Sequence, residues 1–103
     1  MGKLVRVAEA NEIEDGGSKV VQVDGKMLAI FRVKDQFFVL NNACLHRGGP
    51  LGEGDLDGYQ ITCPWHGWSY DVRTGAFGII PPLKVKSYPA RREGSSIMVE
   101  LDE

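Results

Sequence analysis

The two cysteines and two histidines of this chain fall into two mixed pairs that could bind a metal centre. Cys44 and His46 form the first pair, with one residue between them, and Cys63 and His66 form the second, with two residues between them. Sixteen residues separate the pairs. Thiolate and imidazole are the ligands that soft and borderline metals select. The pattern therefore predicts that two loops meet and hold an inorganic centre.

Simpler explanations also fit two cysteines. Cys44 and Cys63 could form a disulfide or could be two buried, inert thiols. The chain starts with Met1-Gly2-Lys3 and then alternates without the features of an export signal, which favours the reducing cytoplasm, where structural disulfides are rare. A tetrahedral zinc site is reasonable too, although such sites usually place cysteines together and histidines together. The mixed pairs instead allow both cysteines to bind one metal ion and both histidines to bind a second.

The spacing and its surroundings resemble the Rieske family of iron–sulfur proteins. The signature Cys-x-His-x16-Cys-x-x-His is present, and family-like segments accompany the two pairs: Gly49-Pro50-Leu51, Gly54-Asp55-Leu56, Cys63-Pro64-Trp65-His66-Gly67-Trp68, Tyr70-Asp71 and Thr74-Gly75. Residues 78–82 are similar to the proline-bearing loop that packs beside the cluster in this family. In a Rieske [2Fe-2S] centre two histidines replace two cysteines on one of the irons. The resemblance thus implies one [2Fe-2S] cluster per chain.

Carried over to this sequence, the resemblance assigns each ligand a place. Cys44 and Cys63 would bind the inner, buried iron, whereas His46 and His66 would bind the outer iron. The two ligand loops are expected to be tips of adjacent hairpins, with the imidazoles at the surface. Four glycines after the first pair are expected to let backbone amides approach the bridging sulfides, which side chains would block: Gly48, Gly49, Gly52 and Gly54.

Three positions indicate which branch of the family the chain resembles. The membrane-anchored members have two further cysteines, joined as a disulfide, where this chain has Gly49 and Trp65. They also have a serine that hydrogen-bonds a sulfide at the position of Trp68, which is here expected in the core. Tyr70 matches a tyrosine that hydrogen-bonds a ligand cysteine, here Cys63. These differences imply the ferredoxin type, with a potential in the lower part of the family range of roughly −150 to +300 mV.

Length and composition exclude other classes. The 103 residues suit one domain over 1–103, and 43% hydrophobic with 25% charged residues is ordinary for a globular chain. A net charge of −2 and a pI near 5.7 predict no nucleic-acid partner, and no segment is long enough to span a membrane. A mononuclear oxygenase iron needs two histidines in addition to the cluster ligands, and the two histidines of this chain are already assigned to the cluster. The chain is therefore predicted to carry electrons rather than to be an enzyme.

Hydrophobic alternation with a period of two predicts an all-β fold. The expected strands are 4–8, 19–23, 27–33, 37–40, 59–62, 68–71, 84–88 and 97–101. Asp24-Gly25 is the strongest hairpin signal, and residues 9–14 contain the single helical turn that is expected. The predicted architecture is a small antiparallel β-sandwich of the Rieske type. A two-loop cluster-binding subdomain is inserted at about 42–67, and the proline loop follows at about 78–82.

The resemblance also implies a function and partners. The chain would be a soluble cytoplasmic electron carrier that takes electrons from an NAD(P)H-dependent flavoprotein reductase and passes them to the terminal component of an aromatic-ring-hydroxylating oxygenase. Transient docking is expected around five residues: His46, His66, Trp65, Pro81 and Pro82. One alternative is the small Rieske-like subunit of an NAD(P)H nitrite reductase. Another is a zinc-stabilised interaction module without a redox role.

Overall fold

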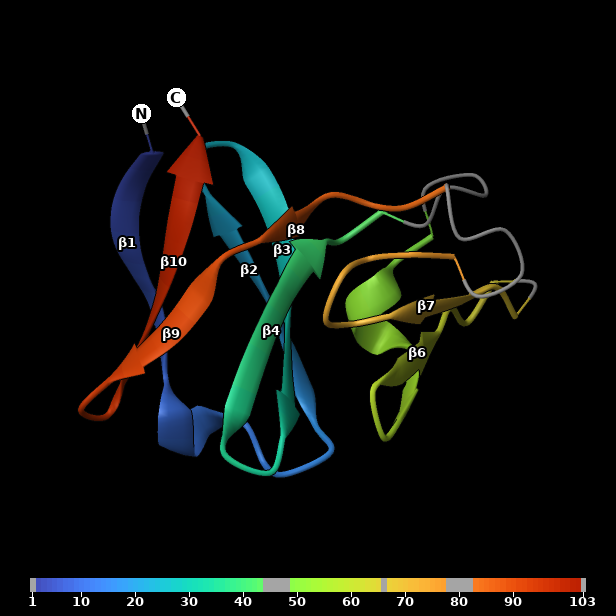
Figure 1. Ribbon diagram of the computed structural model, residues 1–103, viewed down its shortest axis with the longest axis horizontal. Coiled ribbons are helices and arrows are strands. Elements are labelled where there is room, and N and C mark those ends of the chain that lie inside the picture. Colours follow the sequence, from blue (N-terminus) through green and yellow to red (C-terminus); the bar gives the residue numbers. More distant parts are fainter. Residues whose placement is uncertain (1, 44–48, 66, 78–82, 103) are drawn as a thin grey trace.

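The computed structural model describes residues 2–43, 49–65, 67–77 and 83–102. In these residues the chain forms strands and two short 3₁₀ turns (Figure 1). The elements in chain order are β1 Gly2–Glu9, η1 Ala10–Glu12, β2 Ser18–Val23, β3 Lys26–Val33, β4 Gln36–Asn41, η2 Leu51–Glu53, β5 Asp55–Asp57, β6 Gln60–Thr62, β7 Ser69–Asp71, β8 Ser87–Tyr88, β9 Ala90–Glu93 and β10 Ser96–Asp102. The part of the chain that is described contains no helix that could cross a membrane.

The strands form three antiparallel sheets, in the orders β1-β10-β9, β2-β3-β4-β8 and β5-β6-β7. The first two sheets face each other as a sandwich. The third is smaller and lies beside them, on the right in Figure 1. This arrangement confirms the predicted all-β fold and antiparallel sandwich. It also shows that the smaller sheet includes β7, which follows the second expected ligand pair.

The central sheet is buried on both of its faces, and the sequence of β3 explains why. Residues 28–31 form a continuous apolar run whose four members are fully buried. Because successive side chains of a strand point to opposite faces, Leu28 and Ile30 pack in one core, whereas Ala29 and Phe31 pack in another. A strand covered on two sides needs apolar residues on both, so β3 lacks the polar alternation of a half-exposed strand.

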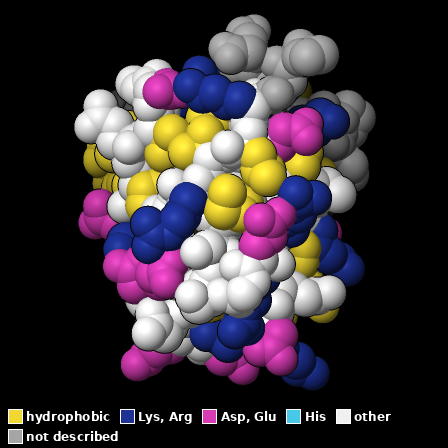
Figure 2. All heavy atoms as spheres, turned by 90° about the vertical axis from the view of Figure 1, so that its left-hand side faces the viewer, with side chains coloured by type: hydrophobic (Ala, Val, Ile, Leu, Met, Phe, Trp, Pro, Cys, Tyr) yellow, Lys and Arg dark blue, Asp and Glu magenta, His cyan; other side chains and the backbone are white. Residues whose placement is uncertain are grey.

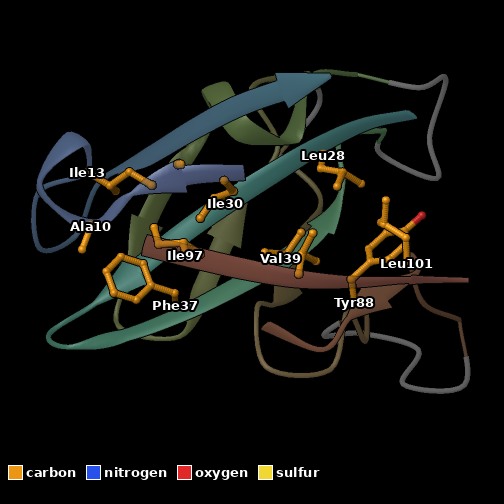
Figure 3. Close-up of a cluster of buried hydrophobic side chains, with 11 residues drawn as sticks. Ala10, Ile13, Leu28, Ile30, Phe37, Val39, Tyr88, Ile97 and Leu101 are labelled. Carbon is orange, nitrogen blue, oxygen red and sulfur yellow. The ribbon is translucent and has the colours of Figure 1, made fainter. Parts of the chain in front are cut away.

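The first core lies between the two large sheets (Figure 3). Ile30 of β3 and Val39 of β4 contribute from one sheet, and Ile97 and Leu101 of β10 contribute from the other. Ile13, which follows the 3₁₀ turn η1, closes one end of this core. The side chains are almost completely removed from water. At about 25 cal/mol per Å² of apolar surface, this burial is the main force that holds the sandwich together.

The second core joins the central sheet to the small sheet. It contains Ala29, Phe31, Leu40, Leu51, Ile61, Cys63, Tyr70, Val72, Phe77 and Val85. The turn η2 contributes Leu51, which is fully buried against β2 and β3. The small sheet is therefore fixed to the sandwich by an apolar interface. Because Cys63 belongs to this core, one of the predicted ligands lies on a rigid support.

The turn chemistry also matches expectation. Asp24 and Gly25 both have positive φ, at 51° and 79°, as a type I′ hairpin turn requires.

Two strands were not predicted, β5 and β9. Asp55-Leu56-Asp57 has one apolar residue, and Ala90-Arg91-Arg92-Glu93 has almost none, so hydrophobic alternation could not reveal them. The expected strand at 84–88 is shorter than predicted, because in the described chain only Ser87–Tyr88 belongs to it and Lys84 forms an isolated bridge with Ala76.

Gly75 allows the chain to cross close to Val85, and its replacement by alanine is expected to destabilise the fold. It has φ +82°, and an added Cβ would collide with the Val85 carbonyl oxygen. Gly16 has nearly the same φ, +80°, but nothing lies within 4 Å of an added Cβ. Urea unfolding should show a loss of about 1 kcal/mol for Gly16→Ala and about 3 kcal/mol or more for Gly75→Ala. Equal losses would mean that the contact with Val85 is unimportant.

Candidate metal centre

The structure describes one of the four predicted ligands, Cys63. The other three, Cys44, His46 and His66, lie outside the described residues, so their assignment as ligands stays a prediction. Leu45, Gly48, Pro81 and Pro82 also lie outside the described residues, as does the whole expected proline loop at 78–82. The site can nevertheless be built from Cys63 and from the segments that flank the undescribed residues.

Cys63 begins the turn that joins β6 to β7, two adjacent antiparallel strands. The hairpin closes at this residue, because the Cys63 N–H donates to the Trp68 carbonyl oxygen at 2.7 Å. In the adjacent cross-strand pair of β6 and β7, the hydroxyls of Thr62 and Ser69 lie 3.1 Å apart and share a hydrogen bond. Gly67 has φ +73°, which suits glycine and lets the turn reverse the chain. The second ligand loop is therefore the tip of a hairpin, as predicted.

The Cys63 side chain is 1% exposed and lies between two loops. The Trp65 N–H points to Cys63 Sγ at 3.4 Å, which is a hydrogen bond to sulfur. Gly49, at the end of the first ligand segment, lies close to the same sulfur. A Cβ added at Gly49 would be 2.9 Å from Cys63 Sγ and 3.0 Å from the nearest carbon of the Trp65 ring. The structure therefore brings the ends of the two ligand segments together at a buried sulfur.

These features fit an iron–sulfur ligand. A thiolate that binds the inner iron must be shielded from water and needs N–H donors to offset its charge. Cys63 has both, since it is buried and receives the Trp65 N–H. Gly49 lacks the one atom that would crowd the sulfur. The contact between positions 49 and 65 also agrees with the resemblance, which places a pair of disulfide-linked cysteines there in other members of the family.

The first ligand segment differs from the expected second hairpin. Residues 42–50 join β4 to η2, and β5 follows η2. β4 pairs with β3 and β8, whereas β5 pairs with β6, so β4 and β5 belong to different sheets. The prediction of two adjacent hairpin tips was thus wrong for this segment. The reason is that the chain passes here from the sandwich to the small sheet, and a tight hairpin cannot make that crossing.

A set of hydrogen bonds that was not predicted holds the end of this segment. The Gly52 N–H donates to Asn42 Oδ1 at 2.6 Å, and the Ser18 hydroxyl donates to the Gly52 carbonyl oxygen at 2.6 Å. Asn42, Ser18 and Gly52 come from three separate places in the sequence. Their partners are 10 and 34 residues apart, and no local pattern could have revealed them.

For two of the four glycines, Gly52 and Gly54, the structure gives a different reason for the missing side chain from the one predicted. A Cβ at Gly52 would collide with Val20, and a Cβ at Gly54 would collide with the Thr62 carbonyl oxygen. Their missing side chains therefore let η2 pack on β2 and let β5 begin beside β6. Gly49 is the described glycine whose open side faces a predicted ligand. Close approach is needed at all three positions, but at Gly52 and Gly54 it is an approach to protein.

The two ends of the expected proline loop are held beside the second ligand hairpin. The Phe77 N–H donates to the Leu83 carbonyl oxygen at 2.8 Å, and the residues next to this pair, Ala76 and Lys84, form a bridge. The Phe77 ring stacks on Trp68, with centroids 4.5 Å apart and planes inclined by 12°. Trp68 is partly buried in the second core, as expected. The base of the loop thus packs against the residue that closes the Cys63 hairpin.

Two aromatic side chains near Cys63 have opposite environments. Trp65 is 47% exposed, so its ring is available at the surface next to the buried sulfur. Tyr70 is fully buried in the same core as Cys63. That placement suits the expected hydrogen bond from the Tyr70 hydroxyl to Cys63, which stays a prediction.

The surface away from this site carries paired charges. Figure 2 shows the side formed by β1, β9 and β10, where basic and acidic side chains lie next to one another. Glu9 pairs with Arg6 at 2.7 Å, and Glu12 pairs with Lys19 at 2.7 Å. A hydrogen bond from Arg6 lowers the pKa of the Glu9 carboxyl, and hydrogen bonds from the Glu9 backbone N–H and from Lys19 lower the pKa of the Glu12 carboxyl, so both are ionised at neutral pH. The acidic stretch that begins at Glu9 is therefore an ordinary, partly neutralised surface.

An ion pair supports the end of β7 and predicts a pH effect. Arg73 contacts both oxygens of Asp71, at 3.0 and 2.9 Å, and these bonds lower the pKa of the Asp71 carboxyl. The pair therefore stabilises the fold above the ordinary aspartate pKa, and its contribution is lost as the pH falls through the lowered value. Asp71→Asn should cost about 1 kcal/mol at pH 7 and less at pH 3 in thermal unfolding. Asp57→Asn, at an exposed position in the same sheet, is the control and should change little.

Comparison with known proteins agrees with this geometry. Residues 3–89 match the family described as Rieske [2Fe-2S] domain. The chain is 35% identical over 100 residues to the ferredoxin component of the naphthalene 1,2-dioxygenase system of Pseudomonas aeruginosa, and the match covers 96% of each chain.

Two solved structures are also similar. The ferredoxin of carbazole 1,9a-dioxygenase from Nocardioides aromaticivorans IC177 superposes with a TM-score of 0.86 at 30% identity, covering 94% of this chain and 96% of that one. A ferredoxin-like chain in a complex of reduced oxygenase and oxidised ferredoxin of carbazole 1,9a-dioxygenase gives 0.85 at 31% identity, covering 93% and 91%. With its family match, its antiparallel sheets and its buried Cys63, this chain belongs to the Rieske [2Fe-2S] domain family.

Proposed function

We propose that this chain is a Rieske ferredoxin, which carries single electrons from an NAD(P)H-dependent flavoprotein reductase to the terminal component of a ring-hydroxylating oxygenase. The observation that carries this proposal is the match over 96% of both chains to a dioxygenase ferredoxin component. Complexes of such ferredoxins with an oxygenase are known among the similar structures. The same match favours this role over the nitrite reductase subunit and over the zinc module.

The proposed ligands are Cys44 and Cys63 for the inner iron and His46 and His66 for the outer iron, with one cluster per chain. When bound, the [2Fe-2S] cluster supplies one electron that can be gained and lost reversibly. The protein's own contribution is burial, orientation and hydrogen bonding. Cys63 supports this assignment, because its sulfur is buried, accepts the Trp65 N–H and faces a glycine. We further propose that residues 1–103 form one domain around this cluster.

We propose a docking surface around His46, His66, Trp65, Pro81 and Pro82. Trp65 supports it, because its side chain is 47% exposed although it lies directly beside the buried sulfur. Leu83, which follows the proline loop, is similarly exposed at 46%. An apolar surface next to an electron carrier suits a small, transient interface, where water is easily displaced and the partner leaves quickly.

The chain is proposed to be a carrier and not an enzyme. Its two histidines are both assigned to the cluster, which leaves none for a second iron that could activate oxygen. We also propose a cytoplasmic location, where NAD(P)H is available to the proposed reductase.

The test starts with the purified chain under anaerobic conditions. Iron and acid-labile sulfide should each be close to two per chain, which is the content of one [2Fe-2S] cluster. Reductive titration should consume one electron per chain, and the reduced protein should give a low-average-g EPR signal. A colourless protein with stoichiometric zinc would instead show the interaction module.

Electron transfer is tested with the terminal oxygenase of naphthalene 1,2-dioxygenase as the probe. The reduced chain is mixed with the oxidised oxygenase in a stopped-flow instrument, and the absorbance of both proteins is followed. Transfer that saturates with oxygenase concentration supports the proposed role. If the loaded chain instead reduces the catalytic subunit of a nitrite reductase and not the oxygenase, the alternative function is correct.

A further inference from the structure

We propose that Asn42 is a positioning residue that closes the first ligand segment by tying residue 42 to residue 52. Its side chain spans the stretch of sequence that contains Cys44 and His46. This inference rests on the proposed function, since the segment has a task only if it binds the cluster. Asn42 is not a ligand in the proposed set and acts through the segment that it holds.

The backbone of Asn42 is fixed to the central sheet. Its N–H donates to the Met27 carbonyl oxygen at 2.9 Å, directly after the last residue of β4. The N–H of Asn41 donates to the Lys86 carbonyl oxygen at 2.9 Å. The segment therefore starts from a fixed point between β3 and the residues that lead into β8. The Asn42 side chain projects from this point with its Oδ1 on the Gly52 N–H.

Gly52 is equally fixed at the far end. The Ser18 hydroxyl of β2 donates to its carbonyl oxygen, and Val20 and Ala29 fill the space where a side chain would be. Gly52 is buried between these groups. Its N–H and its carbonyl oxygen are thus held by two different side chains, Asn42 and Ser18. Of these two, Asn42 belongs to the ligand segment and Ser18 belongs to the sandwich.

The closed segment reaches the buried sulfur through Gly49. This residue lies between Asn42 and Gly52 in the sequence, and a Cβ added to it would press against Cys63 Sγ and the Trp65 ring. A bond that shortens the free path between residues 42 and 52 restricts where residue 49 can lie. Without it, the Gly52 N–H would lose its partner in a partly buried place, and the side-chain tie between residues 42 and 52 would be lost. The Asn42 bond therefore keeps the segment seated against the second ligand hairpin.

The experiment compares three variants of the loaded chain. Asn42→Ala removes the bond. Asn42→Asp keeps an oxygen at the same place to accept from Gly52. Ser18→Ala removes the other hydrogen bond of Gly52 but leaves the ligand segment tied. Iron release to the chelator EDTA is followed by absorbance, and the EPR spectrum of each reduced variant is recorded.

We expect Asn42→Ala to release iron about tenfold faster than the wild type, which is the effect of one buried hydrogen bond. Its EPR g values should also shift, because the ligands relax. Asn42→Asp should return the release rate to within about threefold of the wild type, and Ser18→Ala should stay within about twofold with unchanged g values. If Asn42→Ala is not recovered folded, Asn42→Ser replaces it, since its shorter side chain cannot reach Gly52.

The outcomes separate this inference from the proposed function. Equal acceleration in Asn42→Ala and Ser18→Ala would show that both bonds merely fix η2 to the sandwich, and the positioning role would be overturned. A loaded Asn42→Ala chain with wild-type release and g values would overturn it as well, while leaving the ferredoxin function intact. A wild-type chain without acid-labile sulfide would overturn both.

Discussion

Cys63→Ser should lower the iron and sulfide content of the purified chain by at least tenfold, because it removes the proposed cluster ligand that the structure describes. A serine hydroxyl does not ionise at neutral pH and is a poor donor for iron. The side chain is 1% exposed and packs in the second core, so a water molecule cannot easily take its place. Iron and acid-labile sulfide assays, with the visible spectrum, measure the loss.

The control for this variant is Ile61→Val in the same hairpin. Ile61 is fully buried in the second core, two residues before Cys63. Removal of one methylene should cost about 1 kcal/mol of folding stability and leave the cluster content unchanged. A Cys63→Ser chain with normal iron and sulfide would mean that Cys63 is a packing residue, and the ligand assignment would have to be withdrawn.

The sequence predicted the fold well where each layer has a local signature. Alternating residues marked long strands such as β10, and Asp24-Gly25 marked the first hairpin because only a few residue types adopt positive φ at low cost. Strands made of polar residues, such as β9, gave no such signal. Strand β9 forms because Ala90 to Glu93 pair with the neighbouring strand β10 across the two-residue turn at Gly94 and Ser95, so its stability comes from the partner strand and not from a hydrophobic pattern of its own.

The candidate site was predictable to a different degree in each of its parts. The four proposed ligands were predicted from residue types and spacing, because the chain has no other cysteine or histidine, and their assignment stays a prediction. The hairpin around Cys63 was also foreseen. The crossing from β4 to η2 was not, because its course is set by the packing of Gly52 on Val20 and by the bonds of Asn42 and Ser18. Such contacts depend on three-dimensional proximity.

This distinction explains how the same glycine-rich segment can serve two purposes. Gly52 and Gly54 have no Cβ, which allows two layers of protein to approach and fixes the small sheet on the sandwich. Gly49 has no Cβ beside Cys63 Sγ, which belongs to the candidate site itself. Stability and function are thus separable within six residues of the chain, and substitutions at these positions should affect different measurements.

Gly58→Ala is therefore the suitable control for a substitution at Gly49. Gly58 has φ +61° and lies in the turn between β5 and β6, where nothing is within 4 Å of an added Cβ. Its replacement should cost roughly 1 kcal/mol of stability through backbone strain and should leave the iron and sulfide content unchanged. A stability loss alone is then distinguishable from a loss of the cluster.

Gly49→Ala should lower the cluster content about tenfold, an effect similar in size to that of Cys63→Ser. The added carbon would lie 2.9 Å from Cys63 Sγ, a distance that requires one of the two atoms to move. Because Sγ is attached directly to the Cys63 Cβ, it can move only by rotating away from its present direction. The double variant Gly49→Ala/Trp65→Ala relieves the ring contact and not the sulfur contact, so it should stay depleted. Recovery of iron and sulfide in the double variant would show that the tryptophan ring, rather than the sulfur, sets the requirement for glycine.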